Sequence, residues 1–197
     1  MQDVEFEGKT YTVSFEAMPQ GLEERLQGDS LPRYLKLLEA VQVRPKAVYN
    51  EVKAFGKAHS SVPEVINLLT FAHIQNHRVV EAENLIKETF EKHPEYLFAR
   101  INYGDQCIRK RKLGLIPEIF PTFDLQELCP EKDVFHTSEF RGFLIMMAYY
   151  FRAKKMKEKA LPYLAKAKEI EPNHPSVLYL EKKLLKKSFF LRLFGKQ

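Results

Sequence analysis

Apolar and polar side chains alternate along residues 4–15, on both sides of the sequence Glu7-Gly8-Lys9. A repeat of two residues is typical of a β-strand with one buried face, and a glycine between two such runs is typical of a hairpin. We therefore predict a short β-hairpin within residues 1–16, which must pack on another part of the chain because an isolated hairpin is marginally stable. The apolar side chains predicted to answer each other across the hairpin are Val4, Phe6, Tyr11, Val13 and Phe15.

From residue 31 onward the apolar positions recur every three or four residues, which is the spacing of an α-helix with one buried face. Prolines, glycines and short polar stretches separate the helical segments. Pro45 falls in a first turn, where its missing N–H leaves no hydrogen bond unmade. The predicted segments are 31–41, 45–58, 62–77, 79–94, 96–112, 115–130, 138–155, 158–172 and 175–194. The predicted fold class is all-α, preceded by the small β-hairpin.

Two of these segments, 79–94 and 158–172, share one internal spacing. The matching positions are Ala82, Ile86, Thr89 and Pro94 in the first, and Ala160, Leu164, Ala167 and Pro172 in the second. The helix before each copy, and a middle helix that starts 34 residues after the first, has a small or short residue between large ones, at Thr70, Gly104 and Ala148. A small side chain leaves a notch that lets a neighbouring helix approach closely.

With these positions the chain resembles the tetratricopeptide repeat (TPR) family, whose unit is two antiparallel helices with a small residue at their crossing and a proline after the second. The resemblance implies a right-handed superhelix, or α-solenoid, of stacked helix hairpins. Its middle copy departs from the pattern, because Pro121 should break the second helix and Ile116 replaces the small alanine. About ten further residues around 131–140 are either inserted or used to lengthen a helix. The implied boundaries are a repeat domain at 31–197, repeats at about 63–96, 97–130 and 141–174, and a capping helix at 176–194.

The resemblance also implies a function. In this family the first helices of successive hairpins line a concave groove that binds an extended or helical peptide, and an apolar groove with a few polar residues suits a partner with hydrophobic anchors. The corresponding residues here are Asn67, Phe71, Ile74, Phe98, Asn102, Asp105, Ile108, Ile145, Tyr149 and Arg152. The alternative is that the N-terminal hairpin itself covers the apolar members of this set.

Some TPR proteins use lysine, asparagine and arginine side chains of the groove to capture a C-terminal carboxylate. Only Asn102 matches that arrangement here, since the other places hold Asn67, Phe71, Gly142 and Met146. The resemblance therefore does not imply that the partner is a chaperone's acidic tail.

Composition and charge narrow the functional classes to which the protein could belong. Hydrophobic residues make up 45% of the 197, which is enough for a sizeable core, and two cysteines fit neither a disulfide framework nor a metal pair. Six of the 31 Lys and Arg side chains lie in residues 182–197, which contain no acid, so residues 1–181 have 25 basic and 26 acidic side chains. A nucleic-acid-binding surface is not expected on so neutral a body. With no apolar run long enough to span a bilayer, we expect a cytoplasmic protein.

The basic C-terminal segment, 175–194, has two interpretations. A capping helix would bury Val177, Leu180 and Leu184 and use its lysines to keep the stack soluble. The sequence "FFLRLF" is more apolar than a cap requires, which suits weak docking on an anionic membrane surface or on a second subunit in a homodimer. The candidate residues for such a contact are Lys186, Lys187, Phe189, Phe190, Arg192 and Phe194.

Four sharper motifs have plain structural explanations. "EGKTY" lacks the first glycine of a phosphate-binding loop, so we interpret it as a hairpin turn. His73 and His77 have a zinc-compatible spacing without a third ligand nearby, "RKRK" at 109–112 suits an exposed helix end, and Cys107 suits the core. We therefore predict a non-catalytic protein–protein interaction module without a cofactor or metal. The alternatives are a client-holding chaperone or membrane-surface adaptor, and an enzyme whose site is assembled from scattered residues.

Overall fold

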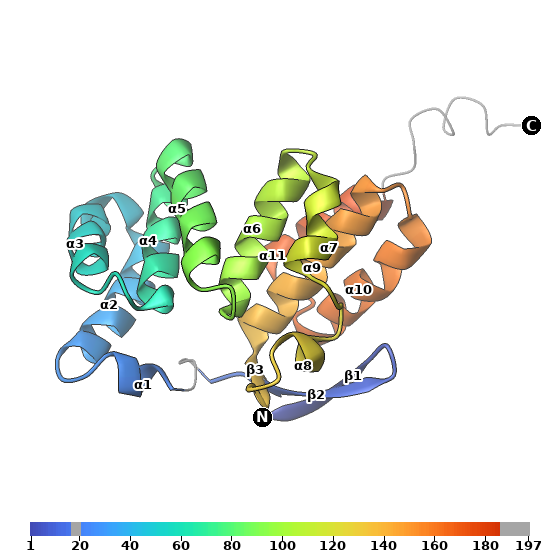
Figure 1. Ribbon diagram of the computed structural model, residues 1–197, viewed down its shortest axis with the longest axis horizontal. Helices are drawn as coiled ribbons and strands as arrows, with labels where there is room; N and C mark the ends of the chain where they lie inside the picture. Colours follow the sequence, from blue (N-terminus) through green and yellow to red (C-terminus); the bar gives the residue numbers. More distant parts are fainter. Residues whose placement is uncertain (17–20, 186–197) are drawn as a thin grey trace, which may run out of the picture.

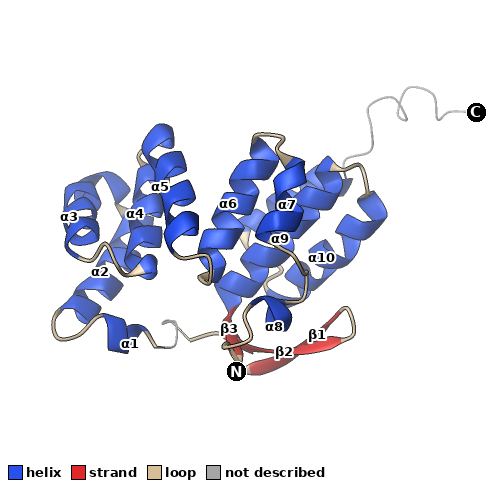
Figure 2. Cartoon of the chain, viewed as in Figure 1, coloured by secondary structure: helices blue, strands red, loops and turns tan. Residues whose placement is uncertain are grey.

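The computed structural model describes residues 1–16 and 21–185, and it is mostly helical with a small three-stranded sheet (Figures 1 and 2). The strands are β1 (Gln2–Phe6), β2 (Lys9–Ser14) and β3 (Val134–His136). The helices are α1 (Leu22–Arg25), α2 (Ser30–Val43), α3 (Pro45–Ala58), α4 (Pro63–Gln75), α5 (Val79–Lys92), α6 (Leu97–Arg109), α7 (Ile116–Ile119), α8 (Leu125–Leu128), α9 (Thr137–Ala153), α10 (Lys157–Ile170) and α11 (Pro175–Leu185), with a 3-10 turn at Leu113–Leu115. The predicted mostly helical architecture is confirmed.

Consecutive long helices pack against each other along the chain. Each helix from α2 to α6 contacts the next, and α9, α10 and α11 do the same (Figure 1). Helices that are not consecutive in the chain also touch: α2 contacts α4, α4 contacts α6, α6 contacts α9, and α9 contacts α11. One series of helices therefore forms a continuous row.

Small side chains lie where these helices cross. Ala82, Ala148 and Ala160 are buried, as the repeat pattern predicts. A Cβ atom placed on Gly104 would lie 3.0 Å from a ring carbon of Phe120 and 3.3 Å from the sulfur of Met146. Because these neighbours already fill the space, α6 can approach α7 and α9 this closely only with a glycine at that position.

The helix predicted over residues 115–130 is interrupted. Residues 116–119 form α7 and residues 125–128 form α8, with Pro121 in the loop between them, as its missing N–H predicts. The core is nevertheless filled there, because Ile116, Phe120 and Leu125 are fully buried.

The N-terminal hairpin forms with the predicted turn. Glu7 and Gly8 both have positive φ angles, of 50° and 76°, and Phe6 lies opposite Lys9. Such a turn matches the twist of two antiparallel strands. The prediction for Phe15 was wrong, because β2 ends at Ser14 and Phe15 is 46% exposed. The hairpin side chains that are buried are Val4, Phe6, Tyr11 and Val13.

A third strand, β3, pairs in parallel with β2, so that Thr12 lies opposite Val134 and Ser14 opposite His136. This strand was not predicted from the sequence, where residues 131–140 were expected to be an insertion or part of a longer helix. Three residues are too few to show a repeat of two, and the pairing partner lies more than 100 residues away. The sheet packs on α9 and α10. Phe6 contacts Tyr163 of α10, with ring centroids 5.0 Å apart, and Tyr11 contacts Phe140 of α9.

The buried apolar side chains form two clusters. One includes residues of α1 to α4, and the other joins the sheet to α6 through α11. The candidate site lies beside the N-terminal ends of α4 and α6 and is lined by Pro63, Glu64, Tyr96 and Leu97 among others.

Asp124, the N-cap of α8, connects the hairpin to the helical body. Its carboxylate accepts hydrogen bonds from the Tyr11 hydroxyl at 3.1 Å and from the backbone N–H of Gln126 at 2.9 Å, and pairs with the Lys9 ammonium at 2.8 Å. Partial burial alone would raise the pKa of Asp124, but the bonds from Lys9, Gln126 and Tyr11 outweigh it, so the pKa is lowered.

We predict that Gly104→Val lowers the free energy of unfolding by about 1–3 kcal/mol, because its methyl groups would overlap Phe120 and Met146. Gly114→Val is the matched control, since a Cβ atom placed on Gly114 would have no neighbouring atom within 4 Å. Urea denaturation of both variants checks this prediction. Equal effects at the two glycines would show that α6 does not depend on this close approach.

We also predict that Asp124→Asn removes part of the acid sensitivity of folding. A carboxyl with a lowered folded-state pKa stabilises the protein above its unfolded pKa of about 3.9, and this contribution disappears as the pH falls through the folded-state value. Urea denaturation from about pH 7 down to about pH 2 should give a shallower loss of stability for the variant. Parallel curves for variant and wild type would contradict this role.

Candidate functional site

The predicted groove residues lie on three neighbouring helices of the row described above. Ile74 is half exposed and Arg152 is exposed, whereas the other members are partly buried. By helix, the residues are Asn67, Phe71 and Ile74 on α4, Phe98, Asn102, Asp105 and Ile108 on α6, and Ile145, Tyr149 and Arg152 on α9. We call this surface the α4–α6–α9 face.

One hydrogen bond joins two members of this face. The amide of Asn102 donates to the side-chain oxygen of Asn67 at 2.8 Å, which joins α6 to α4. Burial raises the pKa of Tyr149 to about 12, and the charges of Tyr179 and Asp105 add to the rise.

The N-terminal hairpin packs at the beginning of α9. Tyr11 contacts Phe135 and Phe140, and Phe6 contacts Tyr163 of α10. Tyr149 lies nine residues after Phe140, which is about 13 Å further along the helix at about 1.5 Å per residue. These contacts hold the hairpin near one end of the α4–α6–α9 face.

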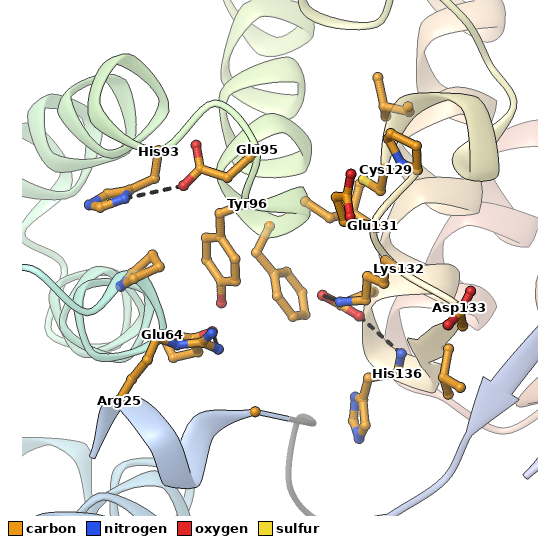
Figure 3. A pocket seen from close by; sticks show the side chains of 18 of the residues that line it. Arg25, Glu64, His93, Glu95, Tyr96, Cys129, Glu131, Lys132, Asp133 and His136 are labelled. Atoms are coloured by element: carbon orange, nitrogen blue, oxygen red, sulfur yellow. Dashed lines mark hydrogen bonds and ion pairs between the residues drawn. The ribbon is translucent and has the colours of Figure 1, made fainter. Parts of the chain in front are cut away.

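A cavity of about 670 Å³ lies beside the N-terminal ends of α4, α6 and α9 (Figure 3). One wall has Arg25 of α1, Glu64 of α4 and the loop 93–95, and the opposite wall is the segment 128–136. Tyr96 and the first residues of α6 lie between the walls (Figure 3). We call this space the polar cavity.

The polar cavity continues the α4–α6–α9 face. Glu64 precedes Asn67 by three residues, so both lie on the same side of α4. Phe98 belongs to the predicted groove and also lines the cavity, and Glu139 is an early residue of α9 that faces it. Glu64 and Glu139 were missed from the sequence because the predicted groove residues on α4 and α9 begin at Asn67 and Ile145, further along each helix. The spacing of Glu64 from Asn67 was the signal that could have extended the predicted groove.

On the first wall, Arg25 pairs with Glu64. The guanidinium donates to Oε1 of Glu64 at 2.6 Å, and Glu64 is only 4% exposed. Its other oxygen, Oε2, is buried and has no hydrogen-bond partner in residues 1–16 and 21–185. Glu64 lies in the first turn of α4, where the helix dipole stabilises a negative charge.

On the opposite wall, His136 caps α9. The Nδ1 atom of the His136 ring accepts a hydrogen bond from the backbone N–H of Ser138. The backbone N–H of His136 donates to Oε2 of Glu139 at 2.9 Å, which completes a capping box. Its Nε2 lies 2.7 Å from the carbonyl oxygen of Glu16, which assigns the proton to Nε2. Lys132 pairs with Oε1 of Glu139 at 2.7 Å. Both oxygens of Glu139 are therefore occupied.

Tyr96 projects into the space between the two walls (Figure 3). Burial raises its pKa well above the ordinary value, and the nearby negative charges of Glu64 and Glu139 raise it further. Its hydroxyl therefore stays protonated at neutral pH and can donate a hydrogen bond.

The cavity lining has more acids than permanently charged bases. The acids are Glu64, Glu95, Glu131, Asp133 and Glu139, and the bases are Arg25 and Lys132. Cys129 also lines the cavity, but burial raises the pKa of its thiol, so it is not an activated nucleophile. The arrangement is suited to binding a hydrogen-bond donor or a positive charge.

The other motifs follow their structural explanations. His73 is buried and its Nδ1 lies 3.2 Å from the Tyr49 hydroxyl, whereas His77 is exposed after the end of α4. The "RKRK" segment is exposed at the end of α6, and burial raises the pKa of Cys107. In the described part of the chain, no three His, Cys, Asp or Glu side chains are grouped so that they could hold a metal ion.

The C-terminal helix is described only as far as Leu185. It buries Val177, Leu180 and Leu184, as predicted, and leaves Leu178 and Tyr179 about half exposed. The candidate membrane or subunit contacts, Lys186, Lys187, Phe189, Phe190, Arg192 and Phe194, lie outside the described residues. Among the helices of residues 1–16 and 21–185, none combines the length and apolar character needed to cross a bilayer.

In comparisons with known proteins, no family model, curated protein or solved structure matches this chain.

We predict that Lys132→Met lowers the free energy of unfolding by about 1–3 kcal/mol, because it leaves the buried Glu139 carboxylate without its cation, an effect reduced by the partial exposure of Lys132. Lys87→Met is the matched control, since Lys87 pairs with Glu91 on the exposed surface of α5. The control should change stability by less than about 0.5 kcal/mol. Chemical denaturation measures both. Equal losses would mean that the Lys132–Glu139 pair is no more important than a surface pair.

Proposed function

We propose that this protein is a TPR-like protein–protein interaction module, and that its α4–α6–α9 face binds a segment of a partner protein without catalysing a reaction. The observation on which the proposal depends is the bond between Asn67 and Asn102. These residues are 35 positions apart, close to one repeat length, and they lie side by side on neighbouring helices.

The helix contacts support a stacked-repeat arrangement. In such a stack each hairpin contacts only its neighbours, and the first helices form one row. The row of α2, α4, α6, α9 and α11 has this order. The proposal therefore extends the repeats by α2 and α3 on one side and by α11 on the other.

The composition of the face favours a protein segment as the ligand. Phe71, Phe98 and Tyr149 are half buried, so part of each ring is available to a partner. Tyrosine and arginine are the residue types that most often dominate binding energy at interfaces. The hydrogen bond from Asn102 to Asn67 uses one N–H of Asn102 and the oxygen of Asn67. The second N–H and the oxygen of Asn102, and the NH2 group of Asn67, can therefore bind a partner's backbone.

Features of the polar cavity argue for binding rather than catalysis. Both ring nitrogens of His136 are used in structural hydrogen bonds, and the thiol of Cys129 has a raised pKa. Neither residue is therefore the free base or activated nucleophile that a catalytic site needs, which leaves only the carboxylates of the lining as candidates. An enzyme with a site made of scattered residues is therefore the less favoured proposal.

A second candidate function uses α11. Leu178, Tyr179 and Leu185 are about half exposed, and Lys182 and Lys183 are exposed on the same helix. Apolar side chains flanked by lysines suit an anionic membrane surface. A membrane-surface adaptor or client-holding chaperone is therefore the alternative to the peptide-binding module.

The proposed function is tested by affinity capture with a variant that changes only exposed residues of the face. Ile74→Asp combined with Arg152→Glu should deplete bound proteins by about tenfold, because both side chains are accessible and neither fills the core. Val80→Asp on α5 is the control, since Val80 is at least as exposed and lies outside the face. Circular dichroism verifies that both variants are folded. If the face variant retains the proteins bound by wild type, the face is not the binding surface.

A further inference from the structure

We infer that the polar cavity binds a guanidinium or ammonium group, and that this group is a basic side chain of the partner segment. The cation-binding part of the inference depends only on the cavity. The assignment to a partner's side chain rests on the proposed function, because the cavity continues the α4–α6–α9 face.

The free oxygen of Glu64 is the first feature that points to a cation. A buried carboxylate oxygen without a hydrogen bond lowers the stability of the fold, and native structures rarely contain one. Arg25 occupies only Oε1, and Oε2 has no partner among the described residues. Glu64 therefore lacks one donor. Oε2 has almost no accessible surface, so a ligand in the cavity can supply that donor when the Glu64 side chain turns toward it.

The position of Glu64 in its helix explains why Oε2 is free. Glu139 is the third residue of α9, from which it reaches back to the N–H of the N-cap residue, His136. Glu64 is the second residue of α4, after Pro63, so it is not in the capping-box position. Its second oxygen is consequently left for another donor.

The charge of the lining is the second feature. Acids outnumber permanently charged bases there, and Lys132 is already held by Glu139. A cation entering the cavity is attracted by this excess of negative charge, whereas an anion is repelled. The donor that completes Glu64 is therefore expected to be positively charged.

A pair of aromatic rings is the third feature. The ring centroids of Tyr96 and Phe98 are 6.0 Å apart, and both residues line the cavity. A guanidinium group stacks on aromatic faces while its N–H groups bind a carboxylate. Tyr96 is neutral at physiological pH, as an ordinary tyrosine is, and can offer its ring and its hydroxyl oxygen to a cation.

The test uses the full chain and two small probes of nearly the same shape. n-Butylguanidinium is cationic and n-butylurea is neutral. NMR titration should show that wild type binds the guanidinium at least about tenfold more tightly, with shifts at the amides of Glu64 and Tyr96. Equal binding of the two probes, or shifts confined to other regions, would overturn the inference.

Glu64→Gln should weaken binding of n-butylguanidinium by at least about tenfold, because it removes the charge and keeps the shape. Glu118→Gln is the matched control, since Glu118 is exposed on α7 and does not line the cavity. Unchanged affinity in the Glu64 variant would overturn the inference. If that variant does not fold, the comparison of the two probes on wild type still decides.

The source of the cation is tested with the dipeptide N-acetyl-Phe-Arg-amide. A side chain presented by a partner segment should bind more tightly than the free guanidinium, since the apolar residue also contacts the α4–α6–α9 face. Equal affinity would overturn the assignment to a partner's side chain. The proposed function fails separately, through retention of captured proteins by the Ile74 and Arg152 variant, and that result leaves the cation site intact.

Discussion

The close approach of neighbouring helices at small side chains is the constraint on which the rest of the structure depends. Gly104 lies against Phe120 and Met146, and Ala148 and Ala160 are fully buried. Each larger side chain there would separate the helices and open gaps in the core. The close approach of α6 to α9 depends on Gly104.

The polar cavity shows how helix ends can place charges between two cores. Glu64 and Glu139 both lie in first turns, where the helix dipole favours an acid. Each is balanced by a cation from outside its own helix, Arg25 from α1 and Lys132 from the segment before β3. Neither cation could be assigned to its acid without the folded arrangement of the chain.

Local sequence signals were sufficient for most of the elements. The hairpin turn at Glu7 and Gly8, the interruption at Pro121 and the buried positions of Ala82 and Ala160 all follow from the chemistry of single residues or from short spacings. β3 could not be predicted, because its three residues obtain their structure from pairing with β2 rather than from their own pattern. For the same reason the polar cavity was missed, since Arg25, Tyr96 and Lys132 come from separate parts of the chain.

The parallel pairing of β2 and β3 has a consequence for how the molecule is held together. In a simple array of hairpins the two ends are independent, so the array can bend or fray from either side. Here the first strands are joined to the residues that lead into α9, and the helices α1 to α8 lie within the closed loop. Closing so long a loop has an entropic cost, which slows the pairing of β2 with β3. This pairing should therefore be among the last to form during folding. Once formed, this pairing links the N-terminal part of the chain to the residues before α9, so the N-terminal helices should not unfold independently of the rest.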